Sequence, residues 1–212
     1  MSITIFASGK IACIGDIPRL IADLKRVAGE HNWGYHVIDD DFDTYPNAVL
    51  TPRSGDDSAA VIEGSLGLKG IVMNVGLGAE PLAILFDRSG VLTDMLQQVS
   101  WIHNNGQGER FTMCKTQFAG IKSHIRVIEL LDGLKQSYIP GLIVNDEGDY
   151  WESRDRRILA EKRIFLGQCL RHAEKVISGI EICGDDVQDT ETIASHIEDA
   201  LLKADEEDSS QH

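Results

Sequence analysis

The sequence predicts an α+β fold with a β-α-β start, an antiparallel meander and then helices packed on one sheet. Three observations lead to this prediction. Apolar residues recur at helical spacing between two short strand-like segments in the first 38 residues, short apolar runs separated by glycine turns fill residues 60–114, and helical spacing returns after Gly120. Strands followed by helices around one sheet are typical of the α+β class.

The β-α-β start rests on local signals. Residues 2–13 hold alternating isoleucines around a Ser-Gly turn, which predicts a strand or a short hairpin. A helix is expected from Asp16, because Asp is a good N-cap and Pro18 falls in the first turn, where a missing N–H costs nothing. This helix should end near Gly29, and residues 35–38 have the composition of a second strand.

The middle of the chain is predicted to be a loop and then a meander. Residues 39–57 are polar and contain prolines, so we expect a long surface loop. In residues 60–114, short apolar runs separated by glycine turns indicate antiparallel strands. Because Val99, Trp101 and His103 alternate with polar residues, they are expected to lie on one of these strands.

Two helices follow the meander. The first is expected between Gly120 and Pro140, with isoleucines and leucines on one face and charged residues on the other. Residues 142–144 predict a short strand, and residues 156–177 predict a further helix. Together these elements predict a single α+β domain over residues 1–179.

The acidic residues are concentrated at the end of the chain. The formal net charge is −14, and residues 180–212 carry −10 of it, which leaves −4 for residues 1–179. We expect an appended acidic helix at 180–204, followed by a disordered acidic tail at 205–212.

Composition excludes several classes of protein. No apolar run reaches the roughly 20 residues of a membrane span, and the first residues lack the features of a signal peptide, so a cytoplasmic protein without membrane contact is expected. Lys and Arg do not cluster, which argues against nucleic acid as a partner. No C-x-x-C spacing supports a zinc or redox site, and the sequence identifies no cofactor. Cys13, Cys114 and Cys169 lie in apolar segments and are expected to be buried thiols.

A first group of candidate residues is acidic. Asp39, Asp41 and Asp43 stand at alternate positions, as at the start of a calcium loop, but Thr44 and Leu50 occupy the positions where such a loop needs Gly and Glu. The group is therefore a weak metal-site candidate. The alternative is that these carboxylates cap turns of a solvated loop.

A second group combines acids with aromatic rings. Glu147 or Glu152, beside Trp151, has the chemistry of a general acid or of a rim for a cationic ligand, and Tyr150 and Trp151 are then candidate binding residues. The alternative is that Tyr150 and Trp151 pack the loop onto the body, while the acids favour the start of the following helix.

A third group lies where the last meander strand leads into a helix. His124 is a candidate base or anion ligand, with Lys115 supplying charge and Gln117 a further polar group. The alternative is a buried, hydrogen-bonded histidine, since Ile121 and Ile125 stand beside it.

The string Lys-Thr-Gln-Phe-Ala-Gly at 115–120, then His124, then Asp-Glu-Gly at 146–148 and Tyr-Trp-Glu at 150–152 resembles a pattern of uncharacterised bacterial proteins of about this size. The resemblance covers roughly residues 65–155 and implies a bacterial cytoplasmic protein of unassigned function. It also implies a shared site, made of Lys115, Gln117, His124, Glu147 and Trp151.

Two functions remain open on the sequence. The favoured one is a non-enzymatic interaction or regulatory protein that binds a protein partner or forms a homodimer, with the acidic C-terminal arm suited to a basic surface. The other is a small hydrolase that uses His124 with Glu147 or Glu152, assisted by a metal if the aspartates at 39–43 hold one.

Overall fold

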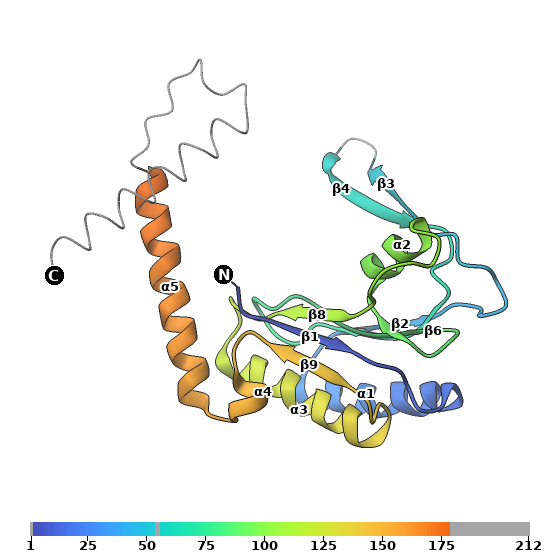
Figure 1. The fold of residues 1–212 in the computed structure, drawn as a ribbon, viewed down its shortest axis with the longest axis horizontal. Coiled ribbons are helices and arrows are strands. Elements are labelled where there is room, and N and C mark those ends of the chain that lie inside the picture. Colours follow the sequence, from blue (N-terminus) through green and yellow to red (C-terminus); the bar gives the residue numbers. More distant parts are fainter. Residues whose placement is uncertain (1, 54–55, 179–212) are drawn as a thin grey trace, which may run out of the picture. The chain divides into compact units, whose positions relative to one another are not determined.

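The computed structural model describes residues 2–53 and 56–178, and these residues form an α+β fold (Figure 1). The chain divides into two compact units, residues 1–160 and 161–212. The first unit holds every described strand and most of the described helices. In the second, residues 161–178 continue the last helix, whereas the acidic helix predicted at 180–204 and the tail predicted at 205–212 lie outside the described residues.

The described elements follow one another in chain order. The strands are β1 (Thr4–Ser8), β2 (Tyr35–Asp39), β3 (Val49–Arg53), β4 (Asp56–Glu63), β5 (Leu68–Met73), β6 (Leu82–Asp87), β7 (Leu92–Thr93), β8 (Thr112–Lys115) and β9 (Ile143–Asp146). The helices are the 3-10 turn η1 (Ile14–Asp16), α1 (Ile17–His31), α2 (Met95–His103), α3 (Ile121–Ser137), α4 (Tyr150–Ser153) and α5 (Arg156–Ser178).

The strands form antiparallel sheets. One has the order β8-β1-β9, the second β2-β5-β6-β7, and β3 and β4 form a separate two-stranded ribbon. The first two sheets adjoin where β8 runs beside β6, and the Thr112 hydroxyl donates to the Ala83 carbonyl at 2.6 Å. The predicted β-α-β start is present as β1-α1-β2, with its two strands in different sheets.

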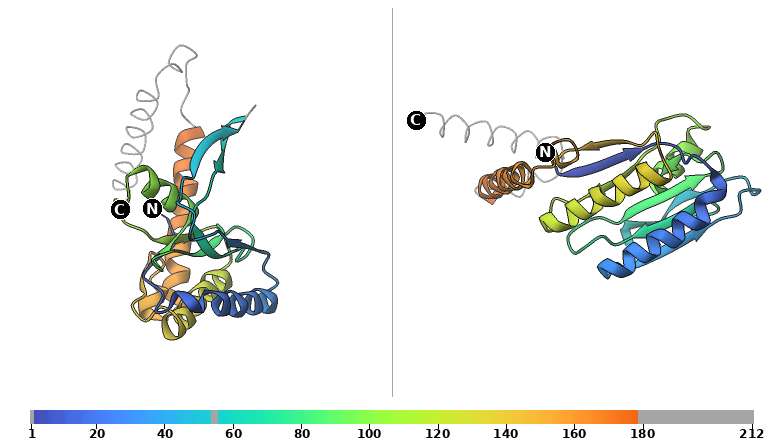
Figure 2. Two further views of the ribbon diagram at one scale, coloured as in Figure 1. Left: turned by 90° about the vertical axis from the view of Figure 1, so that its right-hand side faces the viewer. Right: turned by 90° about the horizontal axis from the view of Figure 1, so that it is seen from below.

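Helices α1 and α3 lie side by side across one face of the sheets (Figure 2, right). Their apolar faces and the sheet residues between them form the larger core, because each element has one apolar side that only the others can cover. The largest side chains that this core buries completely include Ile5, Ile17, Leu20, Ile71, Met73, Ile84 and Phe86.

The opposite face carries α2 and the β3–β4 ribbon (Figure 1). A smaller apolar cluster lies there, formed by Ala48, Leu66, Leu68, Ala83, Leu85 and Val99. The ribbon stands away from the sheet in Figure 1 and again in the left view of Figure 2.

Two predicted elements are wrong. The residues from Val99 to His103 belong to helix α2 rather than to a strand, because the Asp94 side chain accepts the Gln97 N–H at 2.8 Å and caps a helix that buries Val99. Strand β3 lies inside the segment predicted to be only loop. None of the described helices is both long enough and apolar enough to cross a membrane.

Candidate functional site

Three polar side chains from separate segments meet beneath the β8-β1-β9 sheet. Thr116 follows β8, His124 lies in the first turn of α3, and Asp146 ends β9. Since β8 and β9 flank the same strand, β1, they bring Thr116 and Asp146 close together, and α3 places the imidazole of His124 between them.

Hydrogen bonds join the three side chains in a row. The Thr116 hydroxyl lies 2.7 Å from His124 Nδ1, and His124 Nε2 lies 3.2 Å from Asp146 Oδ2. A carboxylate accepts only, so Nε2 carries the proton that faces Asp146. The Thr116 hydroxyl also donates to the Ile3 carbonyl at 3.4 Å, a longer contact than the one to Nδ1.

Asp146 is the centre of this network. Its Oδ1 accepts the Gly148 N–H at 2.7 Å, and its Oδ2 accepts those of Tyr150 and Trp151 at 2.8 and 2.9 Å. Burial alone raises the pKa of Asp146, but the hydrogen bond and charge of His124 and these backbone N–H groups together hold that pKa below its ordinary value. The carboxylate therefore fixes the turn that leads into α4.

The network is closed to solvent. The side chains of His124 and Asp146 are 0% exposed, and Thr116 is also buried. A Cβ added to Gly148 would lie 2.9 Å from His124 Cε1 and 2.8 Å from Leu159 Cδ1, so no atom fits above the imidazole. The order hydroxyl, imidazole, carboxylate is that of a hydrolytic relay, but in this conformation no substrate reaches it.

The two glutamates predicted to work with His124 lie elsewhere. Glu147 Oε2 accepts the Ser2 hydroxyl at 2.6 Å and the Thr4 N–H at 2.9 Å, which ties the start of β1 to the end of β9. Glu152 is exposed on α4. The structure thus brings Asp146, rather than either glutamate, to the histidine.

The predicted binding residues surround the network without forming one pocket. Tyr150 presents its ring edge-on to His124, with the ring centres 6.5 Å apart. Trp151 is half-buried and carries the Lys135 ammonium and the Arg154 guanidinium at 5.5 and 4.8 Å from its ring centre. These contacts pack α4 against α3, which agrees with the alternative that Tyr150 and Trp151 pack this segment onto the body of the protein.

The other two predicted binding residues are also half-buried. Lys115 ends β8 and pairs in register with Thr4 of β1, and Gln117 follows it by two residues. Both flank Thr116 in the chain, and it is Thr116, the residue between them, whose side chain bonds to the imidazole of His124.

The three aspartates predicted as metal ligands have separate partners. Asp39 pairs with Lys69 at 2.5 Å, and Asp41 accepts the Asp43 N–H and the Thr44 hydroxyl at 3.0 and 3.2 Å. Within the described part of the chain, no three His, Cys, Asp or Glu side chains converge as metal ligands would. The contacts are those of turn-capping carboxylates.

The cysteines differ in their surroundings. Cys114 is buried, and burial raises the pKa of its thiol to about 12. Cys13 and Cys169 are exposed, so the expectation that they are buried is wrong. Cys13 immediately precedes η1, and Cys169 lies on an exposed side of α5.

Sequence reasoning missed Asp146, although a signal for it is present. Along β9, burial alternates between exposed Ile143 and Asn145 and buried Val144 and Asp146. Strand alternation places Asp146 on the same inner face as Val144, and a buried acid requires a donor such as His124.

Comparison of the chain with protein-family models, with curated proteins and with solved structures finds no match. The resemblance to uncharacterised bacterial proteins stays a prediction.

Proposed function

We propose that this chain is a non-enzymatic protein-interaction protein that binds a basic protein partner through the β3–β4 ribbon. The observation that carries the proposal is the exposure of apolar side chains on both faces of this ribbon. Leu50 and Val61 are each 45% exposed and Val49 is 38% exposed. Leu50 and Val49 are neighbours on a strand, so their side chains point to opposite faces.

A two-stranded ribbon with apolar residues on both faces gains stability from a third surface. Isolated two-stranded sheets are marginal in water, and their edges present unpaired backbone groups to another chain. Leu96 of α2, a helix that contacts β3, is 56% exposed, and Tyr45, in the segment before β3, is 75% exposed, so both add to the exposed apolar surface near the ribbon. Exposed apolar patches of this kind are typical of protein-binding surfaces.

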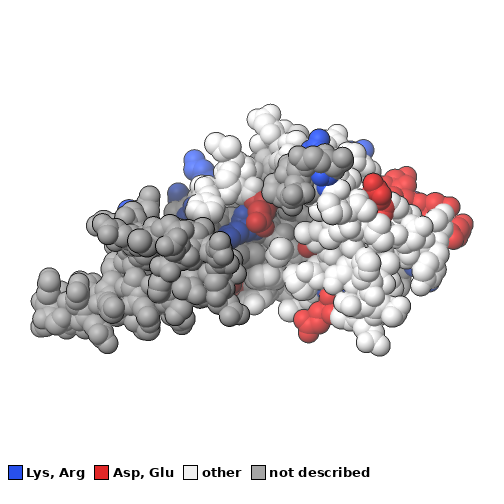
Figure 3. Space-filling view, turned by 90° about the horizontal axis from the view of Figure 1, so that it is seen from above, with Lys and Arg blue, Asp and Glu red and all other residues white. Residues whose placement is uncertain are grey.

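The charge of the chain supports a basic partner. Figure 3, which looks onto the side that carries α2 and the ribbon, shows a broad white surface with acidic side chains at its right-hand end and at its lower edge, and with Lys and Arg along its upper edge. Asp41 and Asp43 are exposed in the segment before β3, and Glu63 is exposed on β4. An apolar surface with these exposed carboxylates beside it complements an apolar patch flanked by Lys and Arg.

The hydrolase alternative is the weaker proposal. It needs His124 to reach a substrate, whereas the closed Thr116–His124–Asp146 network supports a structural role for this histidine. The setting that we propose is the bacterial cytoplasm, on the resemblance given above.

The test uses the full chain as bait, identification and purification of the captured partner, and measurement of the dissociation constant by calorimetry. The double variant Leu50→Glu, Val61→Glu should weaken binding about 30-fold or more, the scale of losing about 2 kcal/mol at an interface hot spot. Binding should also weaken as salt rises.

The control is Leu77→Glu, the same kind of substitution with one added negative charge instead of two, at a 98% exposed leucine between β5 and β6, and it should leave binding unchanged. Equal affinity of the ribbon variant and the original chain would overturn the proposal. If light scattering shows instead that the purified chain pairs with itself through the ribbon, a second copy replaces the basic partner.

A further inference from the structure

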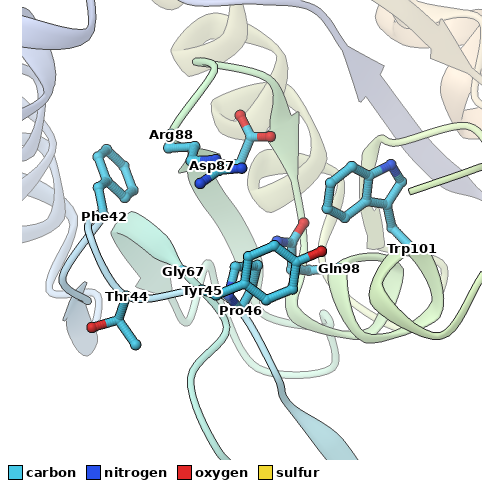
Figure 4. A pocket seen from close by; sticks show the side chains of 9 residues that line it. All are labelled: Phe42, Thr44, Tyr45, Pro46, Gly67, Asp87, Arg88, Gln98 and Trp101. Carbon is cyan, nitrogen blue, oxygen red and sulfur yellow. The ribbon is translucent and has the colours of Figure 1, made fainter. Parts of the chain in front are cut away.

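A small cavity lies at the foot of the ribbon, between the segment that precedes β3 and helix α2 (Figure 4). Its volume is about 40 Å³. The residues that line it are Phe42, Thr44, Tyr45, Pro46, Gly67, Asp87, Arg88, Gln98 and Trp101. One water-sized sphere needs roughly 10–15 Å³, so the cavity holds about three atoms of that size.

Gln98 places an unpaired acceptor in this cavity. The residue is 1% exposed, and its Nε2 donates to the Leu66 carbonyl at 2.9 Å. Its Oε1 is buried and has no hydrogen-bond partner within the described residues. Figure 4 shows this oxygen turned toward the space between Trp101 and the turn that holds Asp87 and Arg88.

The orientation of the Gln98 amide follows from its neighbour. A carbonyl oxygen only accepts, so the NH2 group must face Leu66 and the oxygen must face the cavity. A buried acceptor without a donor is destabilising, and native structures keep few of them. A ligand in the cavity can therefore donate one N–H or O–H group to Gln98 Oε1.

Arg88 supplies the complementary donor. Its guanidinium lies 5.9 Å from the centre of the Tyr45 ring, and among the described residues no ion pair or hydrogen bond involves it. Arg88 and Tyr45 are both exposed, so their side chains change rotamer rapidly and leave the cavity open to a ligand.

Asp87, by contrast, is already engaged. It accepts Arg110 at 2.5 Å and the backbone N–H groups of Ser89 and Val91 at 2.9 Å each. Arg110 also stacks on Trp101, with its guanidinium carbon 4.6 Å from the ring centre. Asp87 and Arg110 thus hold the wall of the cavity and leave Gln98 and Arg88 as the polar groups that a ligand can use.

We infer that this cavity binds the side-chain carboxamide of an Asn or Gln of the protein partner. The NH2 group of the carboxamide donates to Gln98 Oε1, its carbonyl accepts from Arg88, and its flat faces contact Tyr45 and Trp101. The inference rests on the proposed function for the source of the carboxamide, since the cavity adjoins the ribbon.

Other ligands fit the cavity less well. A carboxylate presents only acceptors to the Gln98 oxygen, and an ammonium or guanidinium meets the charges of Arg88 and Arg110. A nucleobase has eight or more heavy atoms, whereas a carboxamide has three, the number for which the cavity has room.

The first experiment tests the chemistry without any partner. The 15N-labelled full chain is titrated with acetamide, and NMR follows the Trp101 indole N–H and the Gln98 side-chain NH2 signals. We expect saturable shifts with a dissociation constant of about 1–100 mM, the range for a ligand of four heavy atoms. N,N-dimethylacetamide, which keeps the carbonyl but has no N–H, should give none.

Variants locate the binding. Gln98→Met should weaken acetamide binding at least tenfold, whereas Gln97→Met, its neighbour on α2, should not. If Gln98→Met fails to fold, Arg88→Met at an exposed position decides instead, with the same expected loss. Absence of saturable shifts, equal shifts with dimethylacetamide, or tighter binding of cytosine would overturn the inference, and the cavity would then hold water only or a base.

The last experiment asks whether the carboxamide comes from a protein side chain or from a free small molecule. N-acetylglutamine N-methylamide, which mimics a side chain within a protein, should bind at least as tightly as free glutamine, and the matched leucine compound should not bind. Free glutamine binding tenfold more tightly would overturn the partner side chain as source. The ribbon variant Leu50→Glu, Val61→Glu should keep acetamide binding, so failure of the proposed function and failure of the cavity site are distinguishable.

Discussion

Replacing Asp146 by Asn tests whether the buried network is a structural tie. The carboxylate accepts four hydrogen bonds, one of them at Oδ1, from Gly148, and three at Oδ2. In the Asp146→Asn variant the best orientation of the new amide keeps its oxygen at the Oδ2 position, so the buried Gly148 N–H faces an NH2 group. That mismatch costs about 1–3 kcal/mol.

The other three bonds also weaken, because they lose their charged acceptor. Charge-assisted hydrogen bonds are roughly twice as strong as neutral ones, which is a loss of about 1 kcal/mol for each bond. Bonds within one network do not add in full, so we expect Asp146→Asn to lower the free energy of unfolding by about 3–5 kcal/mol.

Urea unfolding followed by far-ultraviolet circular dichroism measures this loss. The matched control is Glu152→Gln, the same change of acid to amide at an exposed position of α4, which should alter the free energy of unfolding by less than about 0.5 kcal/mol. A loss below about 1 kcal/mol for Asp146→Asn would show that the network is not a structural tie, and would return His124 to consideration as a proton-transfer residue.

Three further predictions concern Gly148, the pH dependence of stability and the cysteine thiols. Gly148→Ala should destabilise it by about 1–3 kcal/mol in the same urea assay, since the new methyl group overpacks the network. Because the pKa of Asp146 is lower in the folded state than in the unfolded state, its contribution to stability is complete above the unfolded value and is lost as pH falls through the folded one. The free energy of unfolding should thus decline below about pH 4, and less steeply in Asp146→Asn. Iodoacetamide labelling of the native chain, read by mass spectrometry, should modify Cys13 and Cys169 before Cys114, and equal rates would contradict the burial of Cys114.

The elements that the sequence predicts well are those with long, regular apolar spacing. Helix α3 is observed at Ile121–Ser137 and α5 begins at Arg156, close to their predicted bounds. The residues of α2 predict a strand instead, because three alternating residues satisfy a strand pattern as well as a helical one over so short a stretch. The N-cap Asp94 and the helical spacing of Met95, Val99 and Ile102 are the signals that distinguish them.

The candidate site could be predicted only in part. His124 stands out as a titratable residue in an apolar helix, and its alternative, a buried hydrogen-bonded histidine, agrees with its position. Its partner depends on the register of β9 against β1, in which Asp146 lies opposite Ile5. Neither this register nor the pairing of Gln98 with the Leu66 carbonyl follows from sequence spacing, since both join segments more than 30 residues apart.

The central position of β1 has a consequence for synthesis on the ribosome. This strand is made before both of its neighbours in the sheet, residues 112–115 and 143–146, and Ile5 pairs with Asp146, which is made 141 residues later. At about 5–20 residues per second, β1 remains without its partners for about 7–28 s. Its apolar residues Ile5 and Ala7, which the finished fold buries, are accessible during that time, which makes the nascent chain a candidate client for chaperones until β9 emerges.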